Sequence, residues 1–276
     1  SLKSNINESI LMTILLNKSY IQDFQNDGVV LLRGVFNEWI DTLTKGAEHH
    51  ISNPSESALT HKGKDYEGKF LEDFCNWRRI PEYSDFVLNS PLASIAADLM
   101  ESISVQFFHD HFFYKEALSG TPTPWHQDLP YYCVSGHQTV SFWLPLEPRE
   151  KSVSLKSLAG SHSFTKEIRP TSWANNESFY EDDDAFMDMP NADNGDFEIK
   201  QWKTEPGDVV AFNFKTIHGA SANKADDISR TLSFRLLGDD VVYRNRPGRT
   251  SPNFPGINQK DGERLREDWF PIIWGN

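Results

Sequence analysis

Cysteines and basic residues are both scarce in this sequence of 276 residues. Its two cysteines, Cys75 and Cys133, form neither a disulfide framework nor a zinc-binding pattern, so we interpret both as ordinary thiols in a reducing compartment. The 27 Lys and Arg against 40 Asp and Glu give a formal net charge of −13. Such a charge repels phosphate backbones and anionic lipid surfaces, which argues against nucleic-acid and membrane partners.

Long hydrophobic runs are also missing. The short apolar run at residues 10–16 is interrupted by Thr13, lacks a basic flank and is too short to span a bilayer. A cytoplasmic location is therefore the default expectation. Hydrophobic residues make up 38% and charged residues 24% of the chain, a composition typical of a globular protein that buries a core.

The first hundred residues indicate helices around one strand. Ser19 and Asn37 are candidate N-caps of two helices, and Ser90 followed by Pro91 marks the start of a third. Between the first two helices, the aliphatic run 29–32 predicts a strand.

From Ile103 onward, short runs rich in β-branched and aromatic residues alternate with turns, which is typical of a sandwich or barrel. Residues 205–208 (EPGD) are a strong turn signal. We predict a mainly β protein with flanking helices, a double-stranded β-helix of the jelly-roll, cupin-like type. One domain is expected over residues 1–276, with a helical part to about 102, a β core at about 103–240 and an extension at 241–276. The expected core strands are 104–115, 131–134, 139–146, 209–214 and 231–237.

Residues 173–198 hold nine of the 40 acidic residues and no Lys or Arg. One interpretation is a solvated insertion between core strands. The other is a mobile lid over a pocket, because long loops in compact domains are often functional. Metal binding by Asp182, Asp183 and Asp184 is disfavoured, since the spacing of an EF-hand is absent.

Residues 121–128, with the sequence TPTPWHQD, contain the first candidate metal ligands. The prolines stiffen this segment, and if it then runs extended, His126 and Asp128 at i and i+2 point the same way and reach one ion. A His-x-Asp pair alone is weak evidence, because solvated pairs of this kind are common.

A third ligand, His218, follows the predicted strand 209–214. Two histidines and one carboxylate leave three positions of an octahedral ion open, the arrangement of non-haem Fe(II) oxygenases. A chelating 2-oxo acid fills two of these positions and dioxygen fills the last. The sequence therefore predicts Fe(II) on His126, Asp128 and His218 as the catalytic centre, with 2-oxoglutarate as cosubstrate.

An arginine is expected to hold the far carboxylate of 2-oxoglutarate, because a guanidinium donates two parallel hydrogen bonds. Arg230 lies at the start of a predicted strand and is our candidate, and Arg235 is its rival. Their odd separation places them on opposite faces of a regular strand, so only one of them can serve.

The sequence resembles the phytanoyl-CoA dioxygenase-like family of Fe(II)/2-oxoglutarate-dependent oxygenases from about residue 19 to the C-terminus. The matching segments are YIQDFQNDGVVLLRGVF, TPTPWHQDLPYY, SFWLPLE, LAGSH, EPGDVVAF, IHGASAN and SRTLSFR. The resemblance implies a double-stranded β-helix, iron on the three ligands named above and a cosubstrate clamp at Arg230. It also implies that Trp143 lines the 2-oxoglutarate site, although a core indole is an equally good interpretation, and that His111 contacts the cosubstrate.

Halogenases of this family replace the metal carboxylate with a small residue, whereas Asp128 is present here. The resemblance therefore implies a hydroxylase acting on a small molecule, with release of succinate and CO2. One alternative is a cupin-type metal-binding protein or isomerase that uses His109, His111 and Glu116. Another is a non-catalytic jelly-roll binding module, which the presence of all three ligands and the clamp disfavours.

Overall fold

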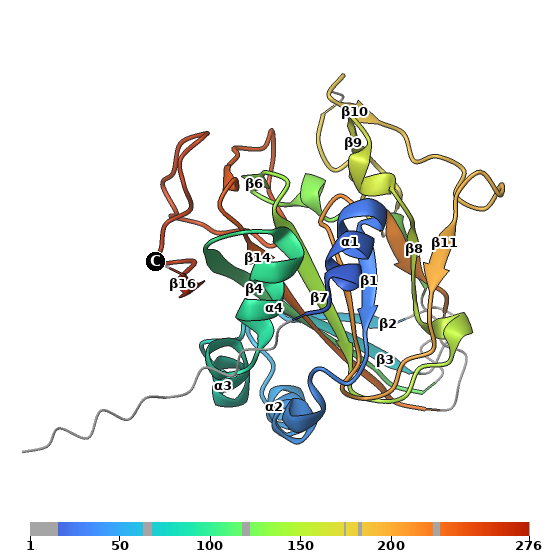
Figure 1. Cartoon of the computed structure of the whole chain (residues 1–276), viewed down its shortest axis with the longest axis vertical. Coiled ribbons are helices and arrows are strands. Elements are labelled where there is room, and N and C mark those ends of the chain that lie inside the picture. The colour runs from blue at the N-terminus through green and yellow to red at the C-terminus, as the bar shows by residue number, and fades with distance from the viewer. Residues whose placement is uncertain are drawn as a thin grey trace, which may run out of the picture.

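Two β-sheets lie face to face at the centre of the molecule, and helices cover the outer face of the larger sheet (Figure 1). The computed structural model describes residues 16–62, 68–117, 122–173, 175–181, 184–222 and 227–275. Asp182, Asp183, Thr121 and residues 10–15 of the N-terminal apolar run lie outside the described residues. Among the described residues, no helix is long and apolar enough to cross a bilayer.

The larger sheet has the strand order β1-β12-β7-β14-β4-β3-β2, and β16 also pairs with β4. Every neighbouring pair in it is antiparallel. Its strands are β1 (Val29–Leu32), β2 (Leu59–Lys62), β3 (Lys69–Phe74), β4 (Val105–Lys115), β7 (Thr139–Pro145), β12 (Val209–Phe212), β14 (Ser229–Leu237) and β16 (Ile272–Trp274).

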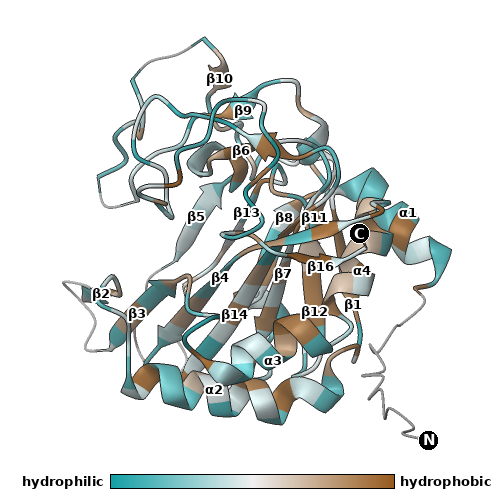
Figure 2. Cartoon of the chain, turned by 90° about the vertical axis from the view of Figure 1, so that its left-hand side faces the viewer, coloured by the Kyte–Doolittle hydropathy of each residue, from teal (hydrophilic) through white to brown (hydrophobic). Residues whose placement is uncertain are grey.

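The smaller sheet has the order β11-β8-β13-β5 and lies opposite the larger one. It consists of β5 (Thr123–His126), β8 (Leu155–Leu158), β11 (Ile199–Gln201) and β13 (His218–Ala220). Two short pairs lie at one end, β6 (Val134–Ser135) with β15 (Val242–Tyr243) and β9 (Glu167–Ile168) with β10 (Phe186–Met187). Figure 2 shows the two sheets stacked, with β9 and β10 at the top.

The helices are α1 (Lys18–Asp27), α2 (Ile40–Ser52), α3 (Pro81–Asn89) and α4 (Leu92–Met100), and short 3-10 turns are η1 (Asn37–Trp39), η2 (Leu129–Tyr131), η3 (Lys151–Val153) and η4 (Ser161–Ser163). Helices α2 and α3 cross the outer face of the larger sheet (Figure 2). The main core lies between these helices and that face.

Strand β14 shows how the sequence assigns the two faces of the large sheet. Leu232, Phe234 and Leu236 are fully buried in the core beneath the helices. The intervening residues, such as Thr231 and Ser233, face the smaller sheet and line a cavity. Burying a side chain such as that of Phe234 contributes about 1.5–3 kcal/mol, so the apolar row fixes which face carries the polar row.

The predicted mainly β fold with flanking helices is confirmed, and most core strands lie where we expected them. The sequence did not reveal β2 and β3, which join the sheet from within the region expected to be helical. Residues 131–134 were expected to be a strand, but they mostly follow the η2 turn, and only Val134 enters β6.

The three predicted caps differ from the structure in their positions. Helix α1 is capped by Asn17, whose side chain accepts a hydrogen bond from the Ser19 backbone N–H at 3.1 Å. Asn37 begins the η1 turn rather than capping α2. Helix α4 begins one residue later than predicted, with Pro91 at the N-cap, although Ser90 Oγ does accept a hydrogen bond from the backbone N–H of Leu92 at 3.2 Å.

Candidate metal centre

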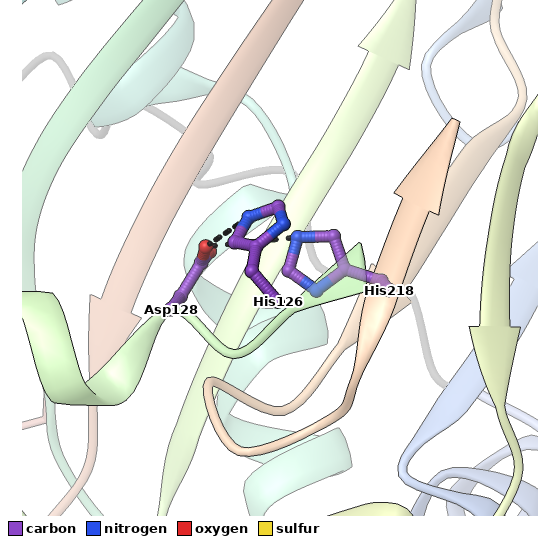
Figure 3. Close-up of side chains that lie close together, drawn as sticks. All are labelled: His126, Asp128 and His218. Carbon is purple, nitrogen blue, oxygen red and sulfur yellow. Dashed lines mark ion pairs between the residues drawn. The ribbon is translucent and has the colours of Figure 1, made fainter. Parts of the chain in front are cut away.

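The three predicted metal ligands converge at one edge of the smaller sheet. His126 ends β5 and His218 begins β13, and the pairing of these strands places the two histidines side by side. Asp128 does not continue the strand as expected, because its backbone is helical (φ −79°, ψ −43°) and leads into η2. The chain therefore turns after His126, and this turn brings the carboxylate toward both imidazoles (Figure 3).

The distances between the ligand atoms fit one ion. The Oδ1 of Asp128 lies 3.2 Å from His126 Nε2 and 3.6 Å from His218 Nε2. Ligand atoms about 2.1 Å from one ion and at right angles to each other are about 3.0 Å apart. Within the described residues, these three are the one group of His, Cys, Asp and Glu side chains close enough to share an ion.

Hydrogen bonds at the far side of each ring set the tautomers that a metal requires. His126 Nδ1 lies 2.8 Å from the Pro124 carbonyl oxygen, and His218 Nδ1 lies 2.9 Å from that of Thr216. A carbonyl can only accept, so the proton is assigned to Nδ1 and the Nε2 lone pair faces Asp128. Three acceptor atoms then face each other in a buried site, which calls for a cation between them.

The charges of the site are also those of a metal-binding centre. Burial alone would raise the pKa of Asp128, but His218 and the guanidinium of Arg235 hold that pKa well below its usual range. Burial, with His126 close by, lowers the pKa of His218 to about 4. At neutral pH the site therefore presents one carboxylate and a neutral His218, both ready to bind a metal.

A cavity of about 330 Å³ opens beside the three ligands, between the two sheets. This volume is near the lower end for small-molecule sites, and it suits a cosubstrate together with a small substrate. The cavity is lined by the ligands, by β2, β3, β4, β7 and β14, and by residues 171–173 and Phe179 at its mouth. Trp173 packs edge-on against His126, with ring centroids 4.8 Å apart.

Arg230 lies on the other face of β14, outside this cavity. Its Nε donates to Glu147 Oε1 at 2.5 Å, and its backbone N–H donates to the other oxygen of that carboxylate at 2.8 Å. Arg235, of the opposite parity, lines the cavity and reaches Asp128 Oδ2 at 3.4 Å. Our expectation that Arg230 is on the inward face is wrong, and its position does not support a role in cosubstrate binding.

The other predicted site residues divide between the cavity and its surroundings. Trp143 and His111 both line the cavity, on strands that flank β14. The cupin alternative is not supported, because His109, His111 and Glu116 do not come together at one site. His109 is buried beside Tyr132, whereas Glu116 accepts a hydrogen bond from the Lys69 backbone at 2.9 Å.

Three charged residues of the cavity wall were missed by the sequence analysis. Arg149 and Lys115 lie near Ser229 at the end of β14 remote from Arg235, and Glu72 lies on β3. Burial, together with the charge of Arg149, lowers the pKa of Lys115 to about 8. Glu72 lies in the segment KFLEDF, which carries three charged residues among six and which we did not recognise as a strand.

The fold and the site together define a jelly-roll protein with a centre of two histidines and one carboxylate. The family model for phytanoyl-CoA dioxygenase (PhyH) matches residues 24–232, and the chain belongs to this family. It is therefore an oxygenase of the iron- and 2-oxoglutarate-dependent class, as the motifs predicted. No curated protein matches the sequence significantly.

Solved structures confirm the fold. The non-haem alpha-ketoglutarate-dependent carbocyclase SnoK from nogalamycin biosynthesis is 19% identical, with a TM-score of 0.74 over 93% of this chain and 96% of that one. The epimerase SnoN from the same biosynthesis is 17% identical, with a TM-score of 0.73 over 94% and 96%. EctD from S. alaskensis is 16% identical, with a TM-score of 0.63 over 83% and 81%.

Proposed function

We propose that the protein hydroxylates a small molecule with Fe(II) bound by His126, Asp128 and His218, and that it converts 2-oxoglutarate to succinate and CO2. The observation that carries this proposal is the set of three acceptor atoms at the wall of a cavity, with both histidine rings fixed by backbone carbonyl partners. Bound iron would supply the activation of dioxygen. The solved complex of SnoN with Fe3+, alpha ketoglutarate and nogalamycin RO supports the pairing of these two cofactors.

Hydroxylation is favoured over halogenation because the Asp128 carboxylate fills the third ligand position. Arg235 also holds that carboxylate toward the two histidines, since Nη2 of Arg235 lies 3.4 Å from Oδ2 and leaves Oδ1 facing the imidazoles. SnoK and SnoN, which share this fold, are a carbocyclase and an epimerase. Identification of the product is therefore needed to distinguish hydroxylation from ring closure and epimerisation.

We also propose that Arg149, not Arg230, holds the far carboxylate of 2-oxoglutarate. Its side chain is buried, lines the cavity and donates to Ser229 Oγ at 2.6 Å. Its charge is only partly balanced, because Glu147 Oε2 lies 3.5 Å away while that carboxylate binds Arg230 more closely. With Lys115 nearby, this end of the cavity is positive, opposite the metal ligands.

The test is an assay of 2-oxoglutarate consumption with Fe(II), ascorbate and dioxygen, followed by mass spectrometry of the product. Succinate formation tests the reaction class, and the product mass tests its outcome. Hydroxylation adds one oxygen atom, epimerisation leaves the mass unchanged, and ring closure removes two hydrogen atoms. A product of unchanged or lower mass would refute the hydroxylase proposal while leaving the iron site in place.

A further inference from the structure

One wall of the cavity carries a carboxylate held between two histidines. Glu72, on β3, is buried, and its Oε1 lies 2.8 Å from His111 Nε2 while its Oε2 lies 3.1 Å from His61 Nε2. His61 is on the edge strand β2 and is half-exposed, whereas His111 is buried on β4. All three residues line the cavity that also holds the metal ligands.

The protonation of this cluster follows from its surroundings. Burial opposes ionisation of Glu72, but hydrogen bonds with His111 and His61 hold its pKa far below the usual range, so it is a carboxylate. Burial lowers the pKa of His111, so its imidazole is neutral at pH 7. A neutral imidazole beside a carboxylate oxygen carries its proton on the nitrogen that faces it, which is Nε2. The Nδ1 atom of His111 is then a hydrogen-bond acceptor.

Packing holds the His111 ring in place. Phe74 stacks against it and Phe113 packs against it at a tilt of 39°, each with a centroid distance of 3.8 Å. Nε2 of His111 is buried and lies 2.8 Å from Glu72 Oε1, whereas Nδ1 has no hydrogen-bond partner among the described residues. Because His111 lines the cavity, a ligand bound there is a source of a partner for Nδ1.

The charge of the cavity wall at Glu72 and His111 favours some chemical classes of ligand over others. A carboxylate ligand such as 2-oxoglutarate is repelled by Glu72 and is better placed beside Arg149, which lines the same cavity. An ammonium group binds best to a carboxylate directly, but both oxygens of Glu72 already contact histidines. The neutral acceptor at His111 Nδ1 is best matched by a neutral hydrogen-bond donor on the ligand. The aromatic rings around His111 favour a ligand with a ring or another flat apolar surface.

We propose that His111 Nδ1 accepts a hydrogen bond from a hydroxyl group of the primary substrate, a neutral alcohol or phenol, and that Glu72 fixes the tautomer that permits it. This assignment rests on the proposed function and specifies the substrate class of the same cavity. His111 is thereby a substrate-binding residue rather than a contact of the cosubstrate, and Glu72 is a positioning residue.

The tautomer is tested by nitrogen NMR of the histidines in the full chain loaded with Zn(II), in which the signal missing from His111→Phe identifies His111. The two ring nitrogens have different shifts, and we expect a neutral ring with the proton on Nε2. A proton on Nδ1, or on both nitrogens, overturns the proposal. In Glu72→Gln we expect a mixture of tautomers, and an unchanged single tautomer removes the positioning role of Glu72.

Substrate class is tested with four probes, which are cyclohexanol, its methyl ether, cyclohexylamine and cyclohexanecarboxylate. Their binding to the Zn(II)- and 2-oxoglutarate-loaded protein is measured by ligand-observed NMR. We expect the alcohol to bind about tenfold more tightly than the ether, the difference of one hydrogen bond. His111→Phe should abolish this preference, and His49→Phe, an exposed histidine on α2, should keep it.

Equal binding of alcohol and ether, tighter binding of the amine or carboxylate, or no binding by any probe would each overturn the substrate assignment. Failure of the proposed function looks different. It appears as absence of succinate from the Fe(II)-loaded parent protein, an assay that requires none of the four probes.

Discussion

Replacing Arg149 with Gln should weaken the binding of 2-oxoglutarate without disturbing the iron ligands. Glutamine keeps a polar side chain at the cavity wall but removes the charge and the planar pair of donors. A charge-assisted hydrogen bond contributes about 1.5–3 kcal/mol, so loss of one such bond raises KM for 2-oxoglutarate about ten- to 150-fold. The lower value is the safer expectation, because Lys115 lies close enough to influence the same end of the cavity.

The assay is succinate release at increasing 2-oxoglutarate with Fe(II) saturating, supported by calorimetric titration of 2-oxoglutarate into the Mn(II)-loaded protein. Arg230→Gln is the matched control, since it makes the same substitution on the outer face of β14. It should raise KM far less than Arg149→Gln does, since it affects the cavity only indirectly, through the release of Glu147 toward Arg149. It should also lower stability by about 1 kcal/mol, because the ion pair with Glu147 is only partly exposed. A large rise in KM for Arg230→Gln with none for Arg149→Gln would refute the assignment.

Three further predictions concern the metal site and its cover. Arg235→Lys should weaken metal binding more than it changes KM for 2-oxoglutarate, because Arg235 contacts the metal ligand Asp128. Calorimetry with Mn(II) measures the metal affinity, and a variant with a changed KM but an unchanged metal affinity would contradict the prediction. Metal-free protein should lose up to about 3 kcal/mol of unfolding free energy as pH falls from 6.5 to 4. The reason is that the pKa of His218 is lowered in the folded protein, so over this pH range only the unfolded chain binds a proton at this residue. Denaturation measured against pH checks this, and His218→Gln should show a flatter dependence. Residues 173–198 should exchange amide hydrogens faster than β4 and β14 and slow down when a substrate binds, and strong protection in the free enzyme would count against a lid.

The three residues of the candidate iron site were predictable because short sequence patterns identify them. A His-x-Asp pair after two prolines and a histidine after a buried strand are local patterns, and they were identified without knowledge of the path between them. The geometry was less predictable. Asp128 faces the histidines through a turn into η2, whereas extended backbone was expected, so three residues that do come together were identified with a wrong local conformation.

The prediction that Arg230 faces the cavity failed for a reason that the sequence does contain. Arg230 shares its strand face with Leu232, Phe234 and Leu236, which pack beneath the helices. The polar face of β14, with Ser229, Thr231, Ser233 and Arg235, is the one that lines the cavity. The alternation of polar and apolar residues along β14 excludes Arg230 from the cavity face, because Arg230 belongs to the apolar row and that row faces the core.

Arg149 and Glu72 could not have been assigned from spacing. Arg149 follows β7 in a loop, and its place beside Ser229 depends on a contact between residues far apart in the sequence. Glu72 acquires its role from pairing of β3 with β4, which sets it beside His111, and from the edge strand β2, which brings His61. Such long-range pairings are set by tertiary packing, which a local pattern does not report.

The most direct test of the account is the yield of succinate from 2-oxoglutarate by the Fe(II)-loaded protein, compared with Asp128→Ala under the same conditions. We expect the parent protein to form succinate and to require both iron and dioxygen. Asp128→Ala should lose this activity and bind iron more weakly while remaining folded, because its neighbours pack in strands and a turn held elsewhere. It should melt below the parent temperature, because the buried Arg235 loses its carboxylate partner. Equal succinate formation by the two proteins, or none by a parent protein shown to bind iron, would contradict the assignment of the iron centre.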